Sequence, residues 1–198
     1  MQQAGRIAWV AGANGMVGAE LLRVLSAGGE YSRVYALTRR PLAFDLPLVA
    51  NRMLRFESLE SELAGLGCED AYCCIGSTLA QAGSQQAFRA VDHDLVLRFA
   101  RCAQAAGAKS FSVLSSAGAA PDAKNFYLRT KGEVELALEA LRFRSLFILQ
   151  PGLLLGPRRE SRPLEAMARA LMPLVNPLLV GRHARWRGIR AREVALAM

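Results

Sequence analysis

The sequence predicts an α/β fold in which a doubly wound parallel sheet is flanked by helices, and three observations support it. A short apolar run, Ile7–Val10, ends in a glycine-rich turn and is followed by a helical pattern. Further apolar strands alternate with helical segments along the chain, as in a series of βαβ units with parallel strands. The 198 residues and the 52% hydrophobic content suit one globular domain with a substantial core. We therefore expect a single domain over residues 1–198.

The glycine-rich turn joins the first strand to the first helix and has the spacing Gly12-x-x-Gly15-x-x-Gly18. In a dinucleotide-binding fold, the first glycine permits a tight turn and the second lets backbone approach a pyrophosphate. The third lets the helix pack close to its strand. The N–H groups at the start of the helix then face the phosphates. The pattern predicts a Rossmann-type dinucleotide site, and an ordinary strand-to-helix turn is the alternative.

The second strand, 33–38, ends in Arg39 and Arg40. In NAD-binding folds an acidic residue usually binds the ribose 2′-hydroxyl here, whereas arginine accommodates a 2′-phosphate. The nearest acidic residue is Asp45, beyond a proline. Because two guanidinium groups suit a phosphate dianion, we expect NADP(H) as the cofactor. Two surface arginines without a ligand are the alternative.

The rest of the nucleotide-binding core continues the alternation of strands and helices. The expected segments are a strand over 51–56, an acidic helix over 57–66, a strand over 70–75 that ends in Gly76-Ser77-Thr78, a helix over 85–106, a strand over 110–114, a helix over 126–142 and a strand over 145–150 that ends in Pro151-Gly152. Small residues after the strand 70–75 would let backbone approach the adenosine ribose. His93 lies between two aspartates in a helix, and without a further ligand at suitable spacing we interpret it as a surface or half-buried residue.

Hydroxyl, phenol and amine side chains follow the strand over 110–114. Ser115 and Ser116 stand at its end, and ligands of doubly wound sheets bind outside the carboxyl ends of the strands. Tyr127 and Lys131 are spaced i and i+4, so they share one face of the next helix. A lysine ammonium beside a phenol favours the phenolate, as a proton-transferring tyrosine requires. We expect Tyr127, Lys131 and one of the two serines at a catalytic site.

The C-terminal region, residues 153–198, is small and basic beside the cofactor-binding core, residues 1–152. From residue 158 onward nine arginines stand against three acidic residues, whereas the preceding chain is nearly balanced. We expect a basic loop over 156–163, a helix over 164–172, an apolar lid or core-packing run over 173–180 and the start of a helix at 193–198. The excess charge would face an anionic substrate, cofactor phosphates, a nucleic acid or a membrane, or would be a solvated surface. The 46 residues after Gly152 predict a small substrate.

Composition and cysteine usage narrow the remaining classes. No apolar run reaches 18 residues, so no membrane span is expected. No aromatic-interleaved RNA-binding pattern or zinc finger accompanies the charge, so nucleic acid is not the expected partner. Cys68, Cys73, Cys74 and Cys102 lack metal-ligand spacing and are interpreted as reduced core residues, with no metal expected. The N-terminus lacks a signal-peptide pattern, so we expect a cytoplasmic protein.

Taken in order, the glycine triplet, the serine pair, Tyr127-x-x-x-Lys131 and Pro151-Gly152 resemble the short-chain dehydrogenase/reductase superfamily. The sequence is more similar to an atypical subgroup, through the segments 38–40, 73–78, 91–94, 114–119, 127–135 and 160–163. The resemblance implies an NADPH-binding Rossmann fold. It implies that Tyr127 exchanges the proton on the substrate oxygen and that a serine, preferably Ser116 and alternatively Ser115, polarises that oxygen. Lys131 would bond the nicotinamide ribose.

The resemblance also implies a set of cofactor contacts. Asn14 to Val17 would line the pyrophosphate, the two arginines would hold the 2′-phosphate, and Ile75 with Gly76 would flank the adenosine. The expected cofactor-binding residues are Gly12, Asn14, Gly15, Met16, Val17, Gly18, Arg39, Arg40, Ile75, Gly76, Ser77, Tyr127, Lys131, Pro151 and Gly152.

Two functions agree with these features. The first is an NADP(H)-dependent oxidoreductase that acts on a small carbonyl or alcohol substrate. The second is a non-catalytic NADPH-binding regulatory protein that senses redox state and binds a protein partner through the basic C-terminal region. Turnover of a carbonyl compound would distinguish the first from the second.

Overall fold

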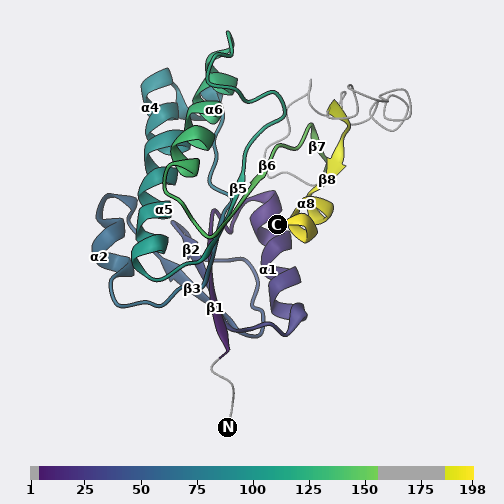
Figure 1. Cartoon of the computed structure of the whole chain (residues 1–198). Helices are drawn as coiled ribbons and strands as arrows, with labels where there is room; N and C mark the ends of the chain where they lie inside the picture. The colour runs from purple at the N-terminus through teal and green to yellow at the C-terminus, as the bar shows by residue number, and fades with distance from the viewer. Residues whose placement is uncertain (1–4, 156–185) are drawn as a thin grey trace.

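A six-stranded parallel sheet forms the centre of the computed structural model, which describes residues 5–155 and 186–198 (Figure 1). Its strands are β1 (Arg6–Ala11), β2 (Tyr31–Thr38), β3 (Val49–Met53), β4 (Asp70–Cys73), β5 (Ser110–Leu114) and β6 (Ser145–Leu149). Their order is β3-β2-β1-β4-β5-β6, and every neighbouring pair is parallel. The order reverses between β1 and β4, which confirms the predicted doubly wound, Rossmann-type sheet. Ligands of such sheets bind at this switch point.

The helices lie on both faces of the sheet. They are α1 (Met16–Gly28), η1 (Phe56–Ser58), α2 (Leu59–Leu63), α3 (Leu79–Ala82), α4 (Gln85–Arg89), η2 (Ala90–Leu95), α5 (Val96–Ala105), α6 (Phe126–Glu139) and α8 (Ala191–Ala197). In Figure 1, α2, α4, α5 and α6 lie on one side, and α1 with α8 on the other. A short parallel pair, β7 (Leu154–Leu155) and β8 (Ile189–Arg190), lies outside the main sheet.

Alternation along the strands explains why the protein has two apolar layers. In β1, Trp9 and Ala11 join the cluster that packs under α2, α5 and α6. Ala8 and Val10 join the opposite cluster, which contains the buried residues of α1 and α8. Successive side chains of a strand point to opposite faces, so a continuous apolar run is what a strand covered on both faces requires.

The amino ends of the strands are held by a buried polar cluster. Asp70 is buried and lies 2.5 Å from an Arg6 nitrogen, and it accepts a 3.1 Å hydrogen bond from the Tyr31 hydroxyl. Burial raises the pKa of Tyr31, with the neighbouring Tyr72 hydroxyl as a further cause.

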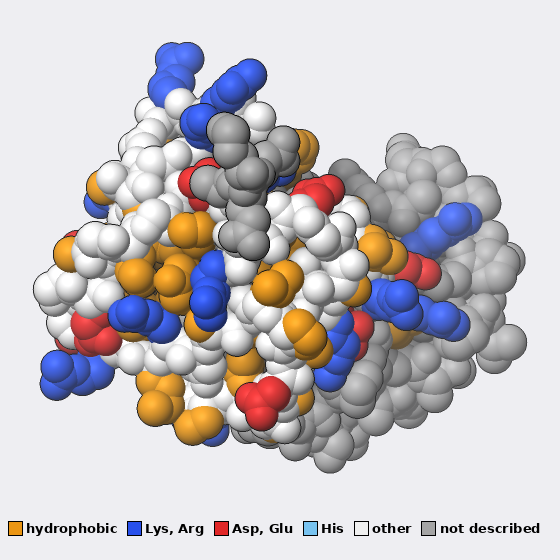
Figure 2. All heavy atoms as spheres, turned by 90° about the horizontal axis from the view of Figure 1, so that it is seen from below, with side chains coloured by type: hydrophobic (Ala, Val, Ile, Leu, Met, Phe, Trp, Pro, Cys, Tyr) orange, Lys and Arg blue, Asp and Glu red, His pale blue; other side chains and the backbone are white. Residues whose placement is uncertain are grey.

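Figure 2 shows the face of the molecule seen from below. On this face, Lys and Arg side chains are interspersed with Asp and Glu side chains rather than gathered in one basic field.

Several boundaries differ from the prediction because the backbone turns within an apolar or acidic pattern. The third strand covers 49–53 rather than 51–56, since Leu48 adopts a φ of 65° and starts the strand earlier. The helix expected over 57–66 is reduced to η1 and α2, and Gly65, with a φ of 77°, follows it. The helix expected to reach residue 142 ends at Glu139, and Arg142 has a φ of 57°.

Two further features were not predicted. The helical region 85–106 contains a π-helical segment, η2, between α4 and α5. The strands β7 and β8 are two residues long, so they carry no periodicity from which to predict them. The expected helical start at residue 193 is α8, which begins at Ala191. The loop, helix and apolar run expected over 156–163, 164–172 and 173–180 lie outside the described residues.

Candidate functional site

The glycine turn places backbone, rather than side chains, at the switch point of the sheet. Gly12 has a φ of 77°, and a Cβ built on it would lie 2.4 Å from the Cys74 carbonyl oxygen. A Cβ on Gly18 would lie 2.4 Å from the Gly12 carbonyl oxygen. Neither distance is compatible with a side chain, so both glycines are required for the strands and the helix to approach this closely. Gly15 is less confined, with 3.1 Å to the same oxygen.

Helix α1 begins at this turn with its first N–H groups uncapped by any side chain. Its N-cap is Gly15 in an extended conformation, and its first turn contains no acidic residue. Asn14 fixes the turn from outside, because its side-chain amide donates a 2.8 Å hydrogen bond to the Arg40 carbonyl oxygen. The start of α1 therefore offers free N–H groups and the positive end of the helix dipole to an anion.

A hollow of about 970 Å³ extends from this turn across the carboxyl ends of the strands. Most of the predicted site residues line it: Asn14, Gly15, Met16, Val17, Gly18, Arg40, Ile75, Gly76, Ser77, Ser115, Tyr127 and Lys131. The other predicted residues are not among the lining residues that the structure describes: Gly12, Arg39, Ser116, Pro151 and Gly152. Gly12 lies below the lining of the hollow, where its backbone contacts the residues that follow β4.

Helix α6 carries Tyr127 and Lys131 to the hollow. Asn125 caps the helix by accepting a 3.2 Å hydrogen bond from the Leu128 N–H. The ring of Tyr127 packs against that of Phe88, with 5.4 Å between centroids. Lys131 is buried, with 7% of its side chain exposed, although it lines the hollow. The spacing of tyrosine and lysine therefore brings both side chains to one cavity, as the sequence predicted.

Lys131 has a buried acidic partner that the sequence analysis did not identify. Its Nζ lies 2.8 Å from Asp92 Oδ1, and the Asp92 side chain is fully buried. Oδ1 has no well-directed hydrogen bond from the described residues, so the contact is an ion pair. Asp92 Oδ2 accepts hydrogen bonds from the N–H and the hydroxyl of Ser77, at 2.8 and 2.5 Å. The neighbouring His93, interpreted from the sequence as a surface or half-buried residue, has its Nδ1 2.7 Å from Asp94 Oδ1.

The two serines differ in their surroundings. Ser115 is buried, and its hydroxyl donates to a carboxylate oxygen of Glu135 on α6. The Gln150 side chain donates to both oxygens of that carboxylate, at 2.9 and 2.8 Å. A hydroxyl that already donates its proton can only accept from a ligand. Within the described residues, Ser116 makes no side-chain hydrogen bond, and it is not among the residues that line the hollow.

The two arginines after β2 also differ. Arg40 lines the hollow, whereas the Arg39 guanidinium lies over the ring of Phe56, 5.7 Å from its centroid. Arg23 also lines the hollow, stacked over Phe44 at 4.8 Å. The structure therefore separates the predicted arginine pair and adds a basic residue from α1.

Part of the basic C-terminal region reaches the same hollow. Arg190 ends β8 and Arg192 lies in the first turn of α8, and both line the hollow together with Leu154 and Leu155. Glu193 caps this helix, since its carboxylate accepts a 3.1 Å hydrogen bond from the Arg190 N–H. The concentration of arginines was visible in the sequence, but the β7–β8 pairing that brings two of them here was not.

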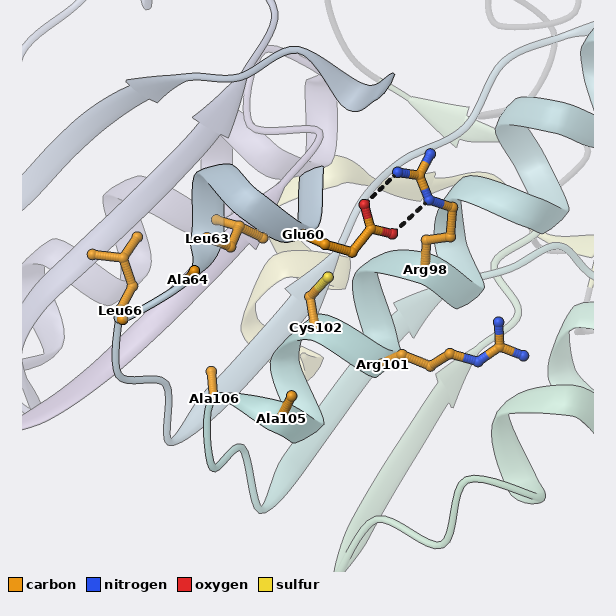
Figure 3. A pocket seen from close by; sticks show the side chains of 10 residues that line it. Glu60, Leu63, Ala64, Leu66, Arg98, Arg101, Cys102, Ala105 and Ala106 are labelled. Atoms are coloured by element: carbon orange, nitrogen blue, oxygen red, sulfur yellow. Dashed lines mark hydrogen bonds and ion pairs between the residues drawn. The ribbon is translucent and has the colours of Figure 1, made fainter. Parts of the chain in front are cut away.

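A second hollow of about 460 Å³ lies between α2 and α5, and none of the predicted site residues line it. Figure 3 shows its apolar side chains, among them Leu63 and Leu66, beside the hydrogen-bonded Glu60 and Arg98. The hydrogen bonds from Arg98 lower the pKa of Glu60 to about 2. Glu60 and Arg98 are paired with each other here, Arg101 also lines this hollow, and the predicted site residues lie at the larger one.

Neither a metal-binding cluster nor a membrane-spanning helix is found among the described residues. Within 5–155 and 186–198, no group of three His, Cys, Asp or Glu side chains could hold a metal ion. The four cysteines are free thiols, and burial raises the pKa of Cys73 to about 12. Among the described helices, none combines the length and the apolar character needed to cross a bilayer.

The fold and the site together define an NAD(P)-binding, Rossmann-type protein of the epimerase and short-chain dehydrogenase/reductase class. Comparison with known proteins identifies the family within this class. The chain belongs to the NAD dependent epimerase/dehydratase family, which it matches over residues 8–174.

The relatives confirm the resemblance to an atypical subgroup. Protein HTATIP2 of Rattus norvegicus is 38% identical over 165 residues, which cover 81% of this chain and 68% of that protein. Protein fmp52, mitochondrial, of Emericella nidulans is 37% identical over 166 residues, covering 80% of this chain and 71% of the relative. Among solved structures, MoeE5 in complex with UDP-glucuronic acid and NAD has a TM-score of 0.66 at 19% identity, covering 85% of this chain and 60% of MoeE5. This last likeness shows the fold alone.

The relatives correct the expected compartment. Several fungal relatives carry the word mitochondrial in their names, which contradicts the cytoplasmic expectation. That expectation depended on the lack of a secretory signal pattern, and this pattern says nothing about other destinations within a cell.

Proposed function

We propose that the chain is an NADP(H)-dependent oxidoreductase of the short-chain dehydrogenase/reductase type, acting on a small carbonyl or alcohol substrate. One observation carries this proposal: a single hollow is shared by the start of α1, by Arg40 and by the pair Tyr127 and Lys131. Phosphate recognition and proton transfer are thereby available in the same cavity. In this proposal residues 1–152 form the cofactor-binding core, and 153–198 contribute the substrate side.

The residues present fit a dinucleotide. The uncapped start of α1 and the close approach at Gly12 and Gly18 leave bare backbone N–H groups where a pyrophosphate would lie. Arg40 is a bidentate donor suited to a 2′-phosphate, which supports NADP(H) over NAD(H). Arg39 would assist from its place over Phe56. Gly76 and Ser77 would face the adenosine side, and Pro151-Gly152 would follow the nicotinamide side.

The chain's own side chains would manage the proton. When bound, the nicotinamide ring supplies a hydride to a carbonyl carbon or accepts one from an alcohol. Tyr127 would donate the proton to the substrate oxygen, or remove it in the reverse direction. Lys131 would bind the nicotinamide ribose. Polarisation of the substrate oxygen would come from a serine: Ser115 lines the hollow but donates to Glu135, and Ser116 lies next to it without lining the hollow.

The size of the hollow supports a small substrate. Ligand sites of about 300–1,000 Å³ hold one drug-sized molecule. A hollow of about 970 Å³ that also receives a dinucleotide leaves space for a small second molecule. Leu154 and Leu155 would cover its apolar part.

The first test is a fluorescence titration of the purified protein with NADPH and with NADH. We expect NADPH to bind more tightly, and Arg40→Ala to weaken NADPH by about 10- to 100-fold, as for loss of a charge-assisted bond to phosphate. The same variant should leave NADH binding nearly unchanged. Arg39→Ala is the matched control and should have a smaller effect. Equal binding of the two nucleotides, insensitive to Arg40→Ala, would exclude NADP(H) specificity.

The second test measures NADPH oxidation with a panel of small aldehydes and ketones. We expect Tyr127→Phe to abolish turnover while NADPH binding is kept, and Tyr35→Phe, on β2, to serve as the matched control. Turnover that survives Tyr127→Phe would remove Tyr127 from the mechanism. Tight NADPH binding without oxidation by any carbonyl would instead favour the regulatory alternative, and capture of a partner only in the presence of NADPH would support it.

A further inference from the structure

Asp92 is an acidic residue that is fully buried, and acidic side chains are rarely buried unless they are paired. Its side chain is fully buried, yet it lies against the cofactor side of the hollow between two of its lining elements. One carboxylate oxygen faces Lys131 on α6, and the other holds Ser77 in the loop after β4. A Cβ on Gly76 would lie 3.5 Å from Asp92 Oδ1 and 3.6 Å from Lys131 Nζ, so the loop fits closely over the pair.

The charges of this pair depend on each other. A buried ammonium without a counter-charge loses its hydration without compensation, and the same holds for a buried carboxylate. Because Oδ1 receives no well-directed hydrogen bond from the described residues, the attraction is mainly between charges. An ammonium has three N–H donors. Beside its contact with Asp92, Lys131 therefore has further donors for a hydroxyl-bearing ligand.

The helix carrying Asp92 is deformed at this residue. The segment η2, Ala90–Leu95, is π-helical between two α-helical segments. A π-turn adds one residue to the helix and is frequently found at functional sites. Asp92 and Leu95 are the buried residues of this segment, so Asp92 lies on the inward side of the widened turn. Neighbouring η2, Arg89 forms an ion pair with Glu133, a second contact between this helix and α6.

We propose that Asp92 is a positioning residue that joins the two ends of the cofactor site. Through Oδ1 it fixes Lys131, which would contact the nicotinamide ribose, and through Oδ2 it fixes the Ser77 loop on the adenosine side. The inference rests on the proposed NADP(H) site. It attributes the orientation and the charge of the Lys131 side chain to the buried carboxylate of Asp92, and not to helix packing alone.

The test compares Asp92→Asn with Asp94→Asn in titrations with NADPH and with 2′,5′-ADP, which lacks the nicotinamide half. Both variants remove one carboxylate from η2, but the Asp94 side chain is 59% exposed and contacts only His93 among the interactions described. We expect Asp92→Asn to weaken NADPH by about 10-fold or more. Binding of 2′,5′-ADP should be unchanged, because an amide oxygen still accepts from the Ser77 N–H. Asp94→Asn should alter neither ligand.

A single substitution in this buried pair could unfold the protein, and circular dichroism would reveal such a loss of structure. A double variant separates that outcome from a loss of binding. Asp92→Asn/Lys131→Gln removes both charges, and we expect it to bind NADPH as Lys131→Gln does alone. A further loss in the double variant, an equal loss of both ligands in Asp92→Asn, or no loss of NADPH would overturn the inference while leaving NADP(H) binding in place. If the folded wild-type chain binds no NADPH, the proposed function falls, and this inference falls with it.

Discussion

Gly12 offers the sharpest test of how the site is built. Replacing it with alanine adds one methyl group at a residue with a φ of 77°. That methyl carbon would lie 2.4 Å from the Cys74 carbonyl oxygen and 2.7 Å from the Ile75 nitrogen, both backbone atoms that no side-chain rotation can move away. The variant must therefore shift β1 and β4 apart at the switch point.

The magnitude has two parts. A left-handed backbone costs an alanine about 1–2 kcal/mol. The forced displacement of packed backbone costs about 1–3 kcal/mol more. We expect Gly12→Ala to lower the free energy of unfolding by about 2–5 kcal/mol, a large part of the stability of an ordinary domain.

Two other glycines supply matched controls. Gly29 has a φ of 73°, but a Cβ on it would meet nothing within 4 Å, so Gly29→Ala carries only the backbone cost. Gly28 has neither a positive φ nor a close neighbour, so Gly28→Ala should stabilise by about 0.5–1 kcal/mol. All three substitutions restrict the unfolded chain equally, so their differences isolate the folded state.

The assay is urea denaturation at 25 °C followed by circular dichroism, with the slope compared among variants. Gly12→Ala should be less stable than Gly29→Ala by about 1–3 kcal/mol, the overpacking part alone. Equal stabilities of these two variants would refute the close approach of β1 and β4 at this turn.

Three further predictions concern pH, helix packing and the core. Burial raises the pKa of Cys73 from 9.0 to about 12, so the free energy of unfolding should fall as pH rises from 9 toward 12. Cys73→Ala should reduce this loss, measured as the difference between the denaturation midpoints at pH 7.5 and pH 10.5. Gly132→Ala would place a methyl carbon 2.2 Å from the Ala120 carbonyl carbon and should destabilise by about 1–3 kcal/mol, whereas an unchanged melting temperature would contradict this packing. Phe99→Ala should cost about 3–5 kcal/mol and exposed Leu196→Ala less than about 1 kcal/mol, and comparable losses would contradict the placement of the core.

The sequence was sufficient for the sheet and for most of the residues that line the hollow, because their signals are local. Apolar runs bounded by glycines define parallel strands, and the spacing of Gly12, Gly15 and Gly18 reflects contacts within one βα unit. The i and i+4 spacing of Tyr127 and Lys131 likewise follows from helix geometry. These patterns needed no knowledge of distant parts of the chain.

The remaining features depend on contacts between distant segments. The burial of Asp92 could not be predicted, because a π-turn inside a helical pattern has no separate sequence signature. The capture of Ser115 by Glu135 joins residues on different elements, and the position of Arg39 over Phe56 depends on the short helix after β3. Such pairings become visible only when the strands are in register.

The pairing of β7 with β8 brings the C-terminal end of the chain to the glycine turn. Leu154 and Leu155 pair with Ile189 and Arg190, and α8, which follows directly, packs on α1. The first and last helices of the described chain therefore support each other beside the hollow. A substitution that loosens the β7–β8 pair would thus reach the start of α1 through α8, although about 160 residues of sequence lie between the end of α1 at Gly28 and the start of α8 at Ala191.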